Sequence, residues 1–132
     1  MLNTMPNGNS YASYKQAAVN TSSPEKLLIM LFNGGIKFIH LAERAIEVKD
    51  YATADKWLLR IQDILMELIY TLDMKQGDIS RNLQRLYEFY HHEVVQANLH
   101  KDAERLGPVL DFFTSFRDTW VEAAKKARLG AK

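Results

Sequence analysis

The chain has 132 residues, a formal net charge of +1 and no cysteine, and these values exclude several classes of protein. The length suits one domain, and an apolar fraction of 47% is too high for a disordered chain. The near-neutral charge gives no electrostatic footprint for nucleic acid. The lack of cysteine removes disulfides, thiolate nucleophiles and thiolate-bound metals. No apolar run approaches the roughly 18 residues that span a bilayer, and no charged secretory start precedes Lys15, so we expect a cytoplasmic protein without membrane insertion.

The first 20 residues differ from the rest of the chain, because they form a polar stretch without a helical period. We expect residues 1–20 to form a flexible N-terminal arm. Tyr11 and Tyr14 stand three apart in it, which places both rings on one side of a helical turn. Two interpretations stay open: the tyrosines are incidental, or the arm docks through both rings.

Helical periodicity begins near Pro24, and two frames describe the start of the first helix. Ser23 before Pro24 fits an N-cap followed by proline at the first helical position, whereas Ser22 with Glu25 fits a capping box. The sequence is consistent with either residue, Ser22 or Ser23, as the N-cap. We expect this helix to cover residues 24–49.

Three further helices follow, each after a polar connection. Asp50 is a natural cap for the second, and Asp78 or Ser80 can cap the third. Gly107-Pro108 should interrupt any helix begun at Asp102, because proline clashes with the preceding turn. The expected ranges are 51–73, 78–99 and 108–128, with a short helical turn before Pro108.

Four helices with short connections and no strand-like alternation predict an all-α fold, an antiparallel up-down four-helix bundle. The bundle domain is expected over residues 21–128, with a tail at 129–132. The third and fourth helices each carry one apolar stripe, which is core on the plainest interpretation. These stripes contain Ile79, Leu83, Leu86, Tyr90, Val94 and Ala97 in the third helix, and Val109, Phe112, Phe113, Phe116, Trp120, Ala123 and Ala127 in the fourth.

The first two helices carry more apolar surface than a bundle core requires. In the first helix the apolar residues cover about 240°, against roughly 100° for a typical half-buried helix. We expect the surplus to need cover from the chain itself, a homodimer partner or another protein, since exposed apolar patches usually mark binding sites. The candidate binding residues are Leu28, Phe32, Ile36 and Ile39 in the first helix, and Leu59, Met66 and Tyr70 in the second.

Gly34-Gly35 inside the first helix has two interpretations. The glycines are a tolerated imperfection, or their missing side chains allow close packing or open a depression.

Catalytic and metal-binding patterns are incomplete. His92-Glu93 lacks the histidine that a zinc-protease helix needs one turn later, because Gln96 stands there. Glu88 and His91 form a single Glu-x-x-His motif, where di-iron bundles need two. We therefore expect no enzyme activity, no metal and no cofactor.

Several short motifs resemble the FliS family, the flagellin-specific export chaperones of bacterial flagellar assembly. The most specific stretches are Val19-Asn20-Thr21-Ser22-Ser23-Pro24 and Met30-Leu31-Phe32-Asn33-Gly34. Further matches are Gly77-Asp78-Ile79, Leu86-Tyr87, Ala97-Asn98, Arg117-Asp118-Thr119-Trp120 and the pair Tyr11 and Tyr14. The sequence departs from the family pattern at Phe32, where tyrosine is usual, and at Asn33, where aspartate is usual.

The resemblance implies a cytoplasmic helical bundle that binds the disordered C-terminal segment of flagellin, prevents its premature polymerisation and delivers it to the flagellar export apparatus. It also implies that the N-terminal arm, with Tyr11 and Tyr14, caps part of the empty site. Two alternatives stay open. The bundle could serve as an adaptor for another flagellar protein such as an anti-sigma factor, and the client-free protein could form a homodimer.

Overall fold

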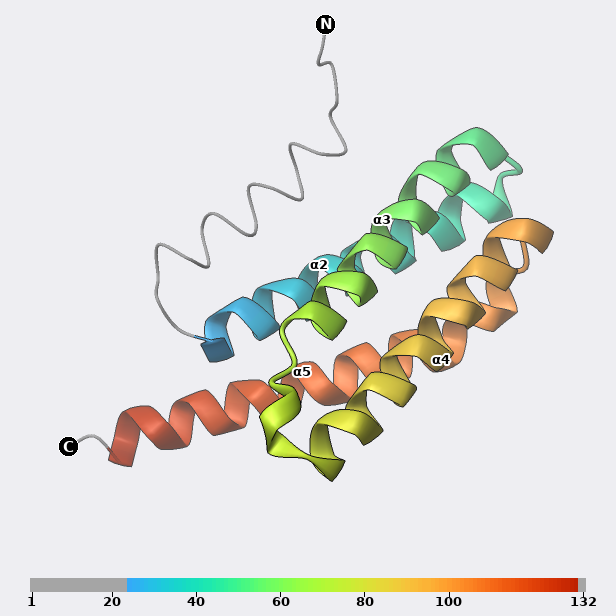
Figure 1. Ribbon diagram of the computed structural model, residues 1–132. Coiled ribbons are helices and arrows are strands. Elements are labelled where there is room, and N and C mark those ends of the chain that lie inside the picture. Colours follow the sequence, from blue (N-terminus) through green and yellow to red (C-terminus); the bar gives the residue numbers. More distant parts are fainter. Residues whose placement is uncertain (1–23, 131–132) are drawn as a thin grey trace, which may run out of the picture.

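The computed structural model describes residues 24–130, which form four long helices running alternately in opposite directions (Figure 1). The elements are α2 (Pro24–Glu47), α3 (Tyr51–Tyr70), η1 (Met74–Gln76), α4 (Asp78–His100), η2 (Ala103–Arg105) and α5 (Leu106–Gly130). These described residues contain no strand, so the prediction of an all-α antiparallel bundle is confirmed. The predicted arm, with Tyr11 and Tyr14, lies outside the described residues.

The start of α3 follows the prediction from sequence. The Asp50 side chain accepts a hydrogen bond from the backbone N–H of Thr53 at 3.2 Å. This bond satisfies one of the amide groups that have no acceptor in the first turn of a helix.

The start of α4 does not follow the prediction, because neither Asp78 nor Ser80 caps it. The N-cap is Gly77, at φ 71° and ψ −127°, a conformation that glycine adopts far more readily than other residues. The buried Ser80 hydroxyl instead donates to the backbone carbonyl of Asp73 at 2.6 Å. This bond ties α4 to the connection from α3.

The last helix also starts earlier than predicted, at Leu106 rather than at Pro108. Proline is tolerated there because amide groups in the first helical turn have no partner within the helix. The short turn expected before Pro108 is present as η2.

The wide apolar faces of α2 and α3 follow from their places in the bundle. Helix α2 packs along both α3 and α5, and α3 packs along both α2 and α4, whereas α4 and α5 contact each other much less. Helices with two long neighbours need two apolar faces. Phe32 and Ile39 accordingly lie in the core, each with 0% of its surface exposed. The expectation that they belong to surplus surface is therefore wrong for these two residues.

Gly35 serves close packing, one of the two interpretations that its position in a helix allows. It is buried in α2, and a Cβ atom built on it would lie well inside van der Waals distance of the Phe113 ring of α5. The absence of a side chain therefore lets α5 approach α2 closely.

Replacing Gly35 by alanine is expected to lower the free energy of unfolding by about 1–3 kcal/mol, despite the higher helix propensity of alanine, because Phe113 must shift. The matched control is Gly107→Ala in the first turn of α5, where nothing lies within 4 Å of the added Cβ. That control should be neutral or slightly stabilising. Urea unfolding followed by circular dichroism measures both, and equal effects would contradict this account of Gly35.

Candidate protein-binding surface

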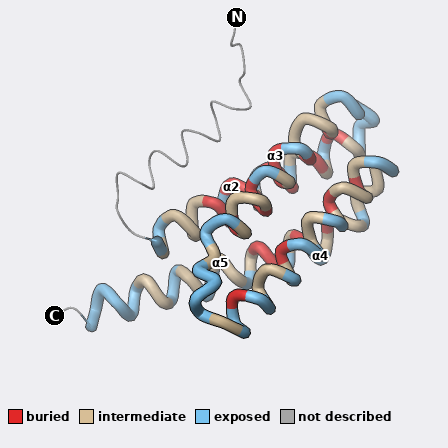
Figure 2. Tube along the Cα trace, in the orientation of Figure 1, coloured by how far each residue is buried: buried red, intermediate tan, exposed pale blue. Residues whose placement is uncertain are grey.

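The apolar stripes of α4 and α5 change from buried to exposed along the length of the molecule. Near η2, where the two helices are joined, their stripe residues are fully covered. Farther away, toward the start of α4 and the end of α5, the stripes are only half-buried, and Ile79 is 68% exposed. Figure 2 shows the same loss of burial toward the C-terminus of α5. Most stripe residues at this end still pack against the core, so the interpretation of the stripes as core is wrong only at the exposed Ile79 and Ala127.

We define the α4/α5 face as the half-buried or exposed part of these two stripes, without Ala127, which lines a depression with Glu25 and Lys26 of α2. Its members are Ile79, Leu83, Leu86 and Tyr90 of α4, and Phe116, Trp120 and Ala123 of α5. It arises because α4 and α5 are the least closely packed pair of neighbouring helices. A lengthwise apolar face of this kind suits the apolar side of another helix.

Aromatic rings form one end of the α4/α5 face. The Tyr90 ring stacks on Phe112 with centroids 4.4 Å apart, and Phe116 lies 4.4 Å from Phe112 on the other side. Phe112 also contacts Phe32 of α2, at 6.2 Å, so the face rests directly on the core. Such ring pairs stabilise by about 0.5–1.5 kcal/mol beyond their burial.

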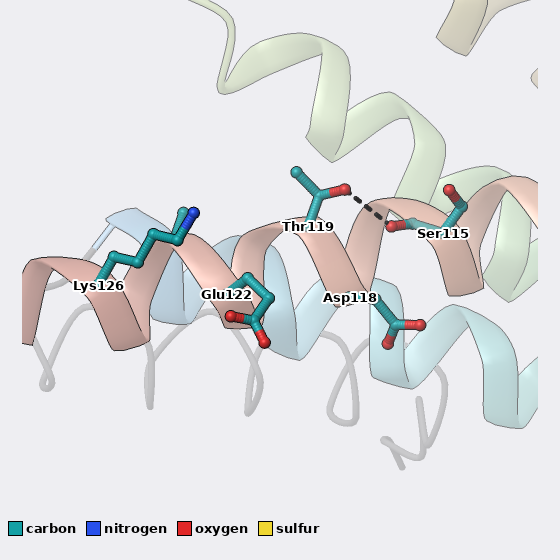
Figure 3. A pocket seen from close by; sticks show the side chains of 6 residues that line it. Ser115, Asp118, Thr119, Glu122 and Lys126 are labelled. Atoms are coloured by element: carbon teal, nitrogen blue, oxygen red, sulfur yellow. Dashed lines mark hydrogen bonds between the residues drawn. The ribbon is translucent and has the colours of Figure 1, made fainter.

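A shallow depression lies on α5 beside the α4/α5 face (Figure 3). Its volume is about 600 Å³, and its lining residues are Ser115, Asp118, Thr119, Glu122, Ala123 and Lys126. Ala123 belongs to both features. The Thr119 hydroxyl donates to the carbonyl of Ser115 within the helix at 3.1 Å. The apolar face therefore has a border of hydroxyl and charged groups, as protein interfaces commonly have.

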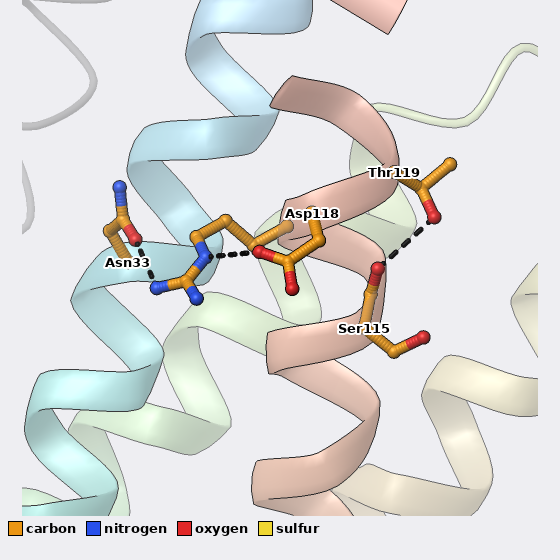
Figure 4. Close-up of polar contacts among 5 residues, drawn as sticks. Asn33, Ser115, Asp118 and Thr119 are labelled. Atoms are coloured by element: carbon orange, nitrogen blue, oxygen red, sulfur yellow. Dashed lines mark hydrogen bonds and ion pairs between the residues drawn. The ribbon is translucent and has the colours of Figure 1, made fainter. Parts of the chain in front are cut away.

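Two motifs that are far apart in the sequence meet between α2 and α5 (Figure 4). The Arg117 Nη1 donates to Oδ1 of Asn33 at 3.2 Å, and its Nε donates to Oδ1 of Asp118 at 3.1 Å. Because Asn33 is neutral, the contact between the helices is a hydrogen bond and not an ion pair. An aspartate at this position would convert it into an ion pair.

The remaining candidates from the first two helices lie on two separate sides of the molecule. On α2, Leu28 and Ile36 are half-buried against the core, one turn on either side of Phe32, whose ring packs against Phe113 of α5. On α3, Met66 is half-buried, while Leu59 is 44% and Tyr70 74% exposed.

The α3 candidates lie on the side nearest α4. Asp55, one turn before Leu59, accepts a hydrogen bond from Asn98 of α4 at 2.8 Å. The structure therefore does not bring the α2 and α3 candidates into a single site.

Sequence patterns missed the α4/α5 face, because periodicity identifies an apolar side but not whether a neighbour covers it. One signal was available. The α5 stripe tapers from phenylalanine to Ala123 and Ala127, and small side chains cover less of a neighbouring helix than large ones do.

Ionisable groups between α3 and α4 have shifted pKa values. Burial raises the pKa of Asp63, against the opposing effects of Arg60 and His91. Burial lowers the pKa of His91, which Asp63 partly offsets. These side chains lie away from the α4/α5 face. Within residues 24–130, no group of three or more histidine, aspartate or glutamate side chains is placed to hold a metal.

Burial raises the pKa of the Tyr87 hydroxyl to about 12, from an ordinary value of 10.0. The folded state therefore favours the neutral phenol, and this contribution is complete below pH 10 and lost as the pH rises toward 12. The loss should amount to about 2–3 kcal/mol. Tyr87→Phe should lack this component, so its unfolding free energy should fall less between about pH 9 and pH 11 than that of the parent chain. Identical pH dependence in the two proteins would contradict the assignment.

The fold and the surface together define the class: a small antiparallel helical bundle with a half-buried apolar face along α4 and α5. No helix in the described part is long and apolar enough to cross a membrane.

Comparison with known proteins identifies the family. Residues 7–127 match the family described as flagellar protein FliS. The flagellar secretion chaperone FliS of Bacillus subtilis is 38% identical over 120 residues, which cover 91% of this chain and 90% of that protein. The FliS chaperones of Campylobacter jejuni and Salmonella typhimurium are 31% and 30% identical, over 89% and 85% of this chain and 93% and 84% of their own lengths. The chain belongs to the FliS family, as its motifs indicated.

Proposed function

We propose that this protein is a flagellar secretion chaperone that binds the disordered C-terminal segment of flagellin in the cytoplasm. Membership of the FliS family supports the chaperone role, since the relatives named above are flagellar secretion chaperones. The structural observation that carries the proposal is the α4/α5 face, whose apolar residues are only half-buried or exposed within residues 24–130.

The chemistry of the α4/α5 face suits a client that folds on binding. A disordered segment loses conformational entropy when it binds, and the burial of apolar surface must offset that loss. An amphipathic client helix would place apolar side chains, at helical spacing, against Leu83, Leu86 and Trp120. The polar border at Thr119 and Lys126 would then contact its hydrophilic side.

A longer client would also contact the other exposed candidates. Leu59, Met66 and Tyr70 on α3 and Leu28 and Ile36 on α2 lie on separate sides, so one client reaches both groups only by wrapping around the bundle. Extended segments can wrap large surfaces in this way. Phe32 and Ile39 support this surface from the core and do not contact the client.

The N-terminal arm is proposed to compete with the client through Tyr11 and Tyr14. Deleting residues 1–18 should then tighten the binding of a flagellin C-terminal peptide. A full-length control with Tyr11→Ala and Tyr14→Ala separates the rings from the rest of the arm and should tighten binding similarly. Unchanged affinity would show that the arm does not compete, and weaker affinity would show that it contacts the client.

Binding of the flagellin C-terminal segment should keep flagellin monomeric until delivery to the export apparatus. The test is an assembly assay with purified flagellin, in which an equimolar amount of this protein should suppress filament growth seeded with filament fragments. A flagellin without its C-terminal segment should not bind. Unimpeded assembly, together with recovery of an anti-sigma factor in place of flagellin from cells, would favour the adaptor function instead.

A further inference from the structure

A polar network fixes the end of the molecule at which α4 and α5 are joined. The Asn98 side chain of α4 donates to Asp55 of α3 at 2.8 Å. The Lys101 ammonium, just past the end of α4, donates to both the backbone carbonyl and the side-chain oxygen of Asn98 at 2.7 Å. The end of α4 is thereby tied to α3.

Arg105 connects α4 to the start of α5. Its Nη1 lies 3.6 Å from Oε1 of Glu93 on α4, and its Nε lies 3.6 Å from Oδ2 of Asp102 in the connection. The Arg105 Nε is buried without a hydrogen-bond acceptor, so these two carboxylates provide its electrostatic compensation. The next residue, Leu106, begins α5 and has 0% of its surface exposed.

Because α5 is long, a small change of the helix angle at this junction moves the far end of α5 by a large distance. Helix α5 has 25 residues and extends about 37 Å at 1.5 Å per residue. A 5° change at the junction would therefore move the far end of α5 by about 3 Å. Contacts between α4 and α5 oppose such a change mainly at the aromatic rings of Tyr90 and Phe112, and the packing of α5 along α2 provides the remaining resistance.

We propose that Arg105, through Glu93 and Asp102, is a positioning residue that fixes the angle between α4 and α5. It thereby sets the width of the α4/α5 face without touching the client. The consequence for binding rests on the proposed function, whereas the consequence for the helix angle does not.

The experiment measures the distance between the first half of α4 and the last half of α5 in the full-length chain. The sequence has no cysteine, so Arg85→Cys on α4 and Lys125→Cys on α5 provide two unique and exposed spin-label sites. Double electron–electron resonance spectroscopy gives the distribution of distances between the two spin labels. Arg105→Gln and Glu93→Gln are compared with Arg44→Gln, which breaks an exposed ion pair with Glu47 inside α2.

In both junction variants the distance distribution should broaden by a few ångström. In Arg44→Gln it should stay as it is in the parent chain. Affinity for a flagellin C-terminal peptide should fall about 3- to 10-fold in the same two variants. The double variant should be no weaker than Arg105→Gln alone, because that change already removes the ion pair with Glu93. An unchanged distribution would overturn the proposal, and a broadened one with unchanged affinity would overturn its link to binding. If the parent chain binds no peptide, the proposed function fails while the distances still test the junction.

Discussion

Alanine in place of Phe32 is expected to lower the free energy of unfolding by about 3–5 kcal/mol, a large part of the stability of a small domain. The Phe32 ring is fully buried and packs edge-on against Phe113 at 5.4 Å, with Phe116 at 6.0 Å. Its removal leaves a cavity where α2 meets α5. The measurement is equilibrium urea unfolding followed by far-ultraviolet circular dichroism.

The matched control for this experiment is Phe89→Ala. The Phe89 side chain is 54% exposed on α4, and its ring contact with Tyr90 is at 5.2 Å. This control should cost less than about 1 kcal/mol, as surface substitutions usually do. A loss below 1 kcal/mol for Phe32→Ala would show that Phe32 is not a core residue, and a surface role in binding would then return.

The double substitution Ile79→Asp, Leu83→Asp is expected to weaken binding of the flagellin C-terminal peptide by about 100-fold or more. Each substitution removes an apolar contact and would place a carboxylate where the client covers the α4/α5 face. Ile79 is 68% exposed and Leu83 half-buried, so the helical fold should survive. Isothermal calorimetry measures the affinity, and circular dichroism checks the helicity.

The control substitutes the same acidic residue on apolar side chains at the opposite end of the bundle. Val48 is 53% and Leu99 70% exposed, so Val48→Asp with Leu99→Asp repeats the chemical change on accessible residues. Peptide affinity should stay within about 3-fold of the parent value. Equal losses in the two double variants would show that the α4/α5 face has no special role.

Sequence periodicity predicted the helices well, because each long segment has a clear 3.6-residue pattern and a polar connection. The helix boundaries were predicted less well, because other local interactions compete with the capping patterns read from the sequence. Gly77 starts α4 because the chain needs a positive φ there, and Ser80 bonds to Asp73 instead of capping. Pro108 is tolerated because it falls in the first turn of a helix that begins at Leu106.

The binding surface was harder to predict, because the amount of apolar residue in a helix does not show which neighbours cover it. Phe32 and Ile39 looked like surplus on α2, but α2 lies between two long neighbours. Ile79 looked like core on α4, but α4 has only a limited contact with α5. The order of contacts between helices is a long-range property, which a single sequence does not display.

The most direct test of a client-binding α4/α5 face is calorimetric titration of the whole chain with a synthetic flagellin C-terminal peptide at several temperatures. One peptide should bind per chain with a clearly negative heat-capacity change, since binding buries apolar surface. Both should be lost in the Ile79→Asp, Leu83→Asp variant. Absence of binding to the parent chain, or undiminished binding to that variant, would contradict a client-binding α4/α5 face.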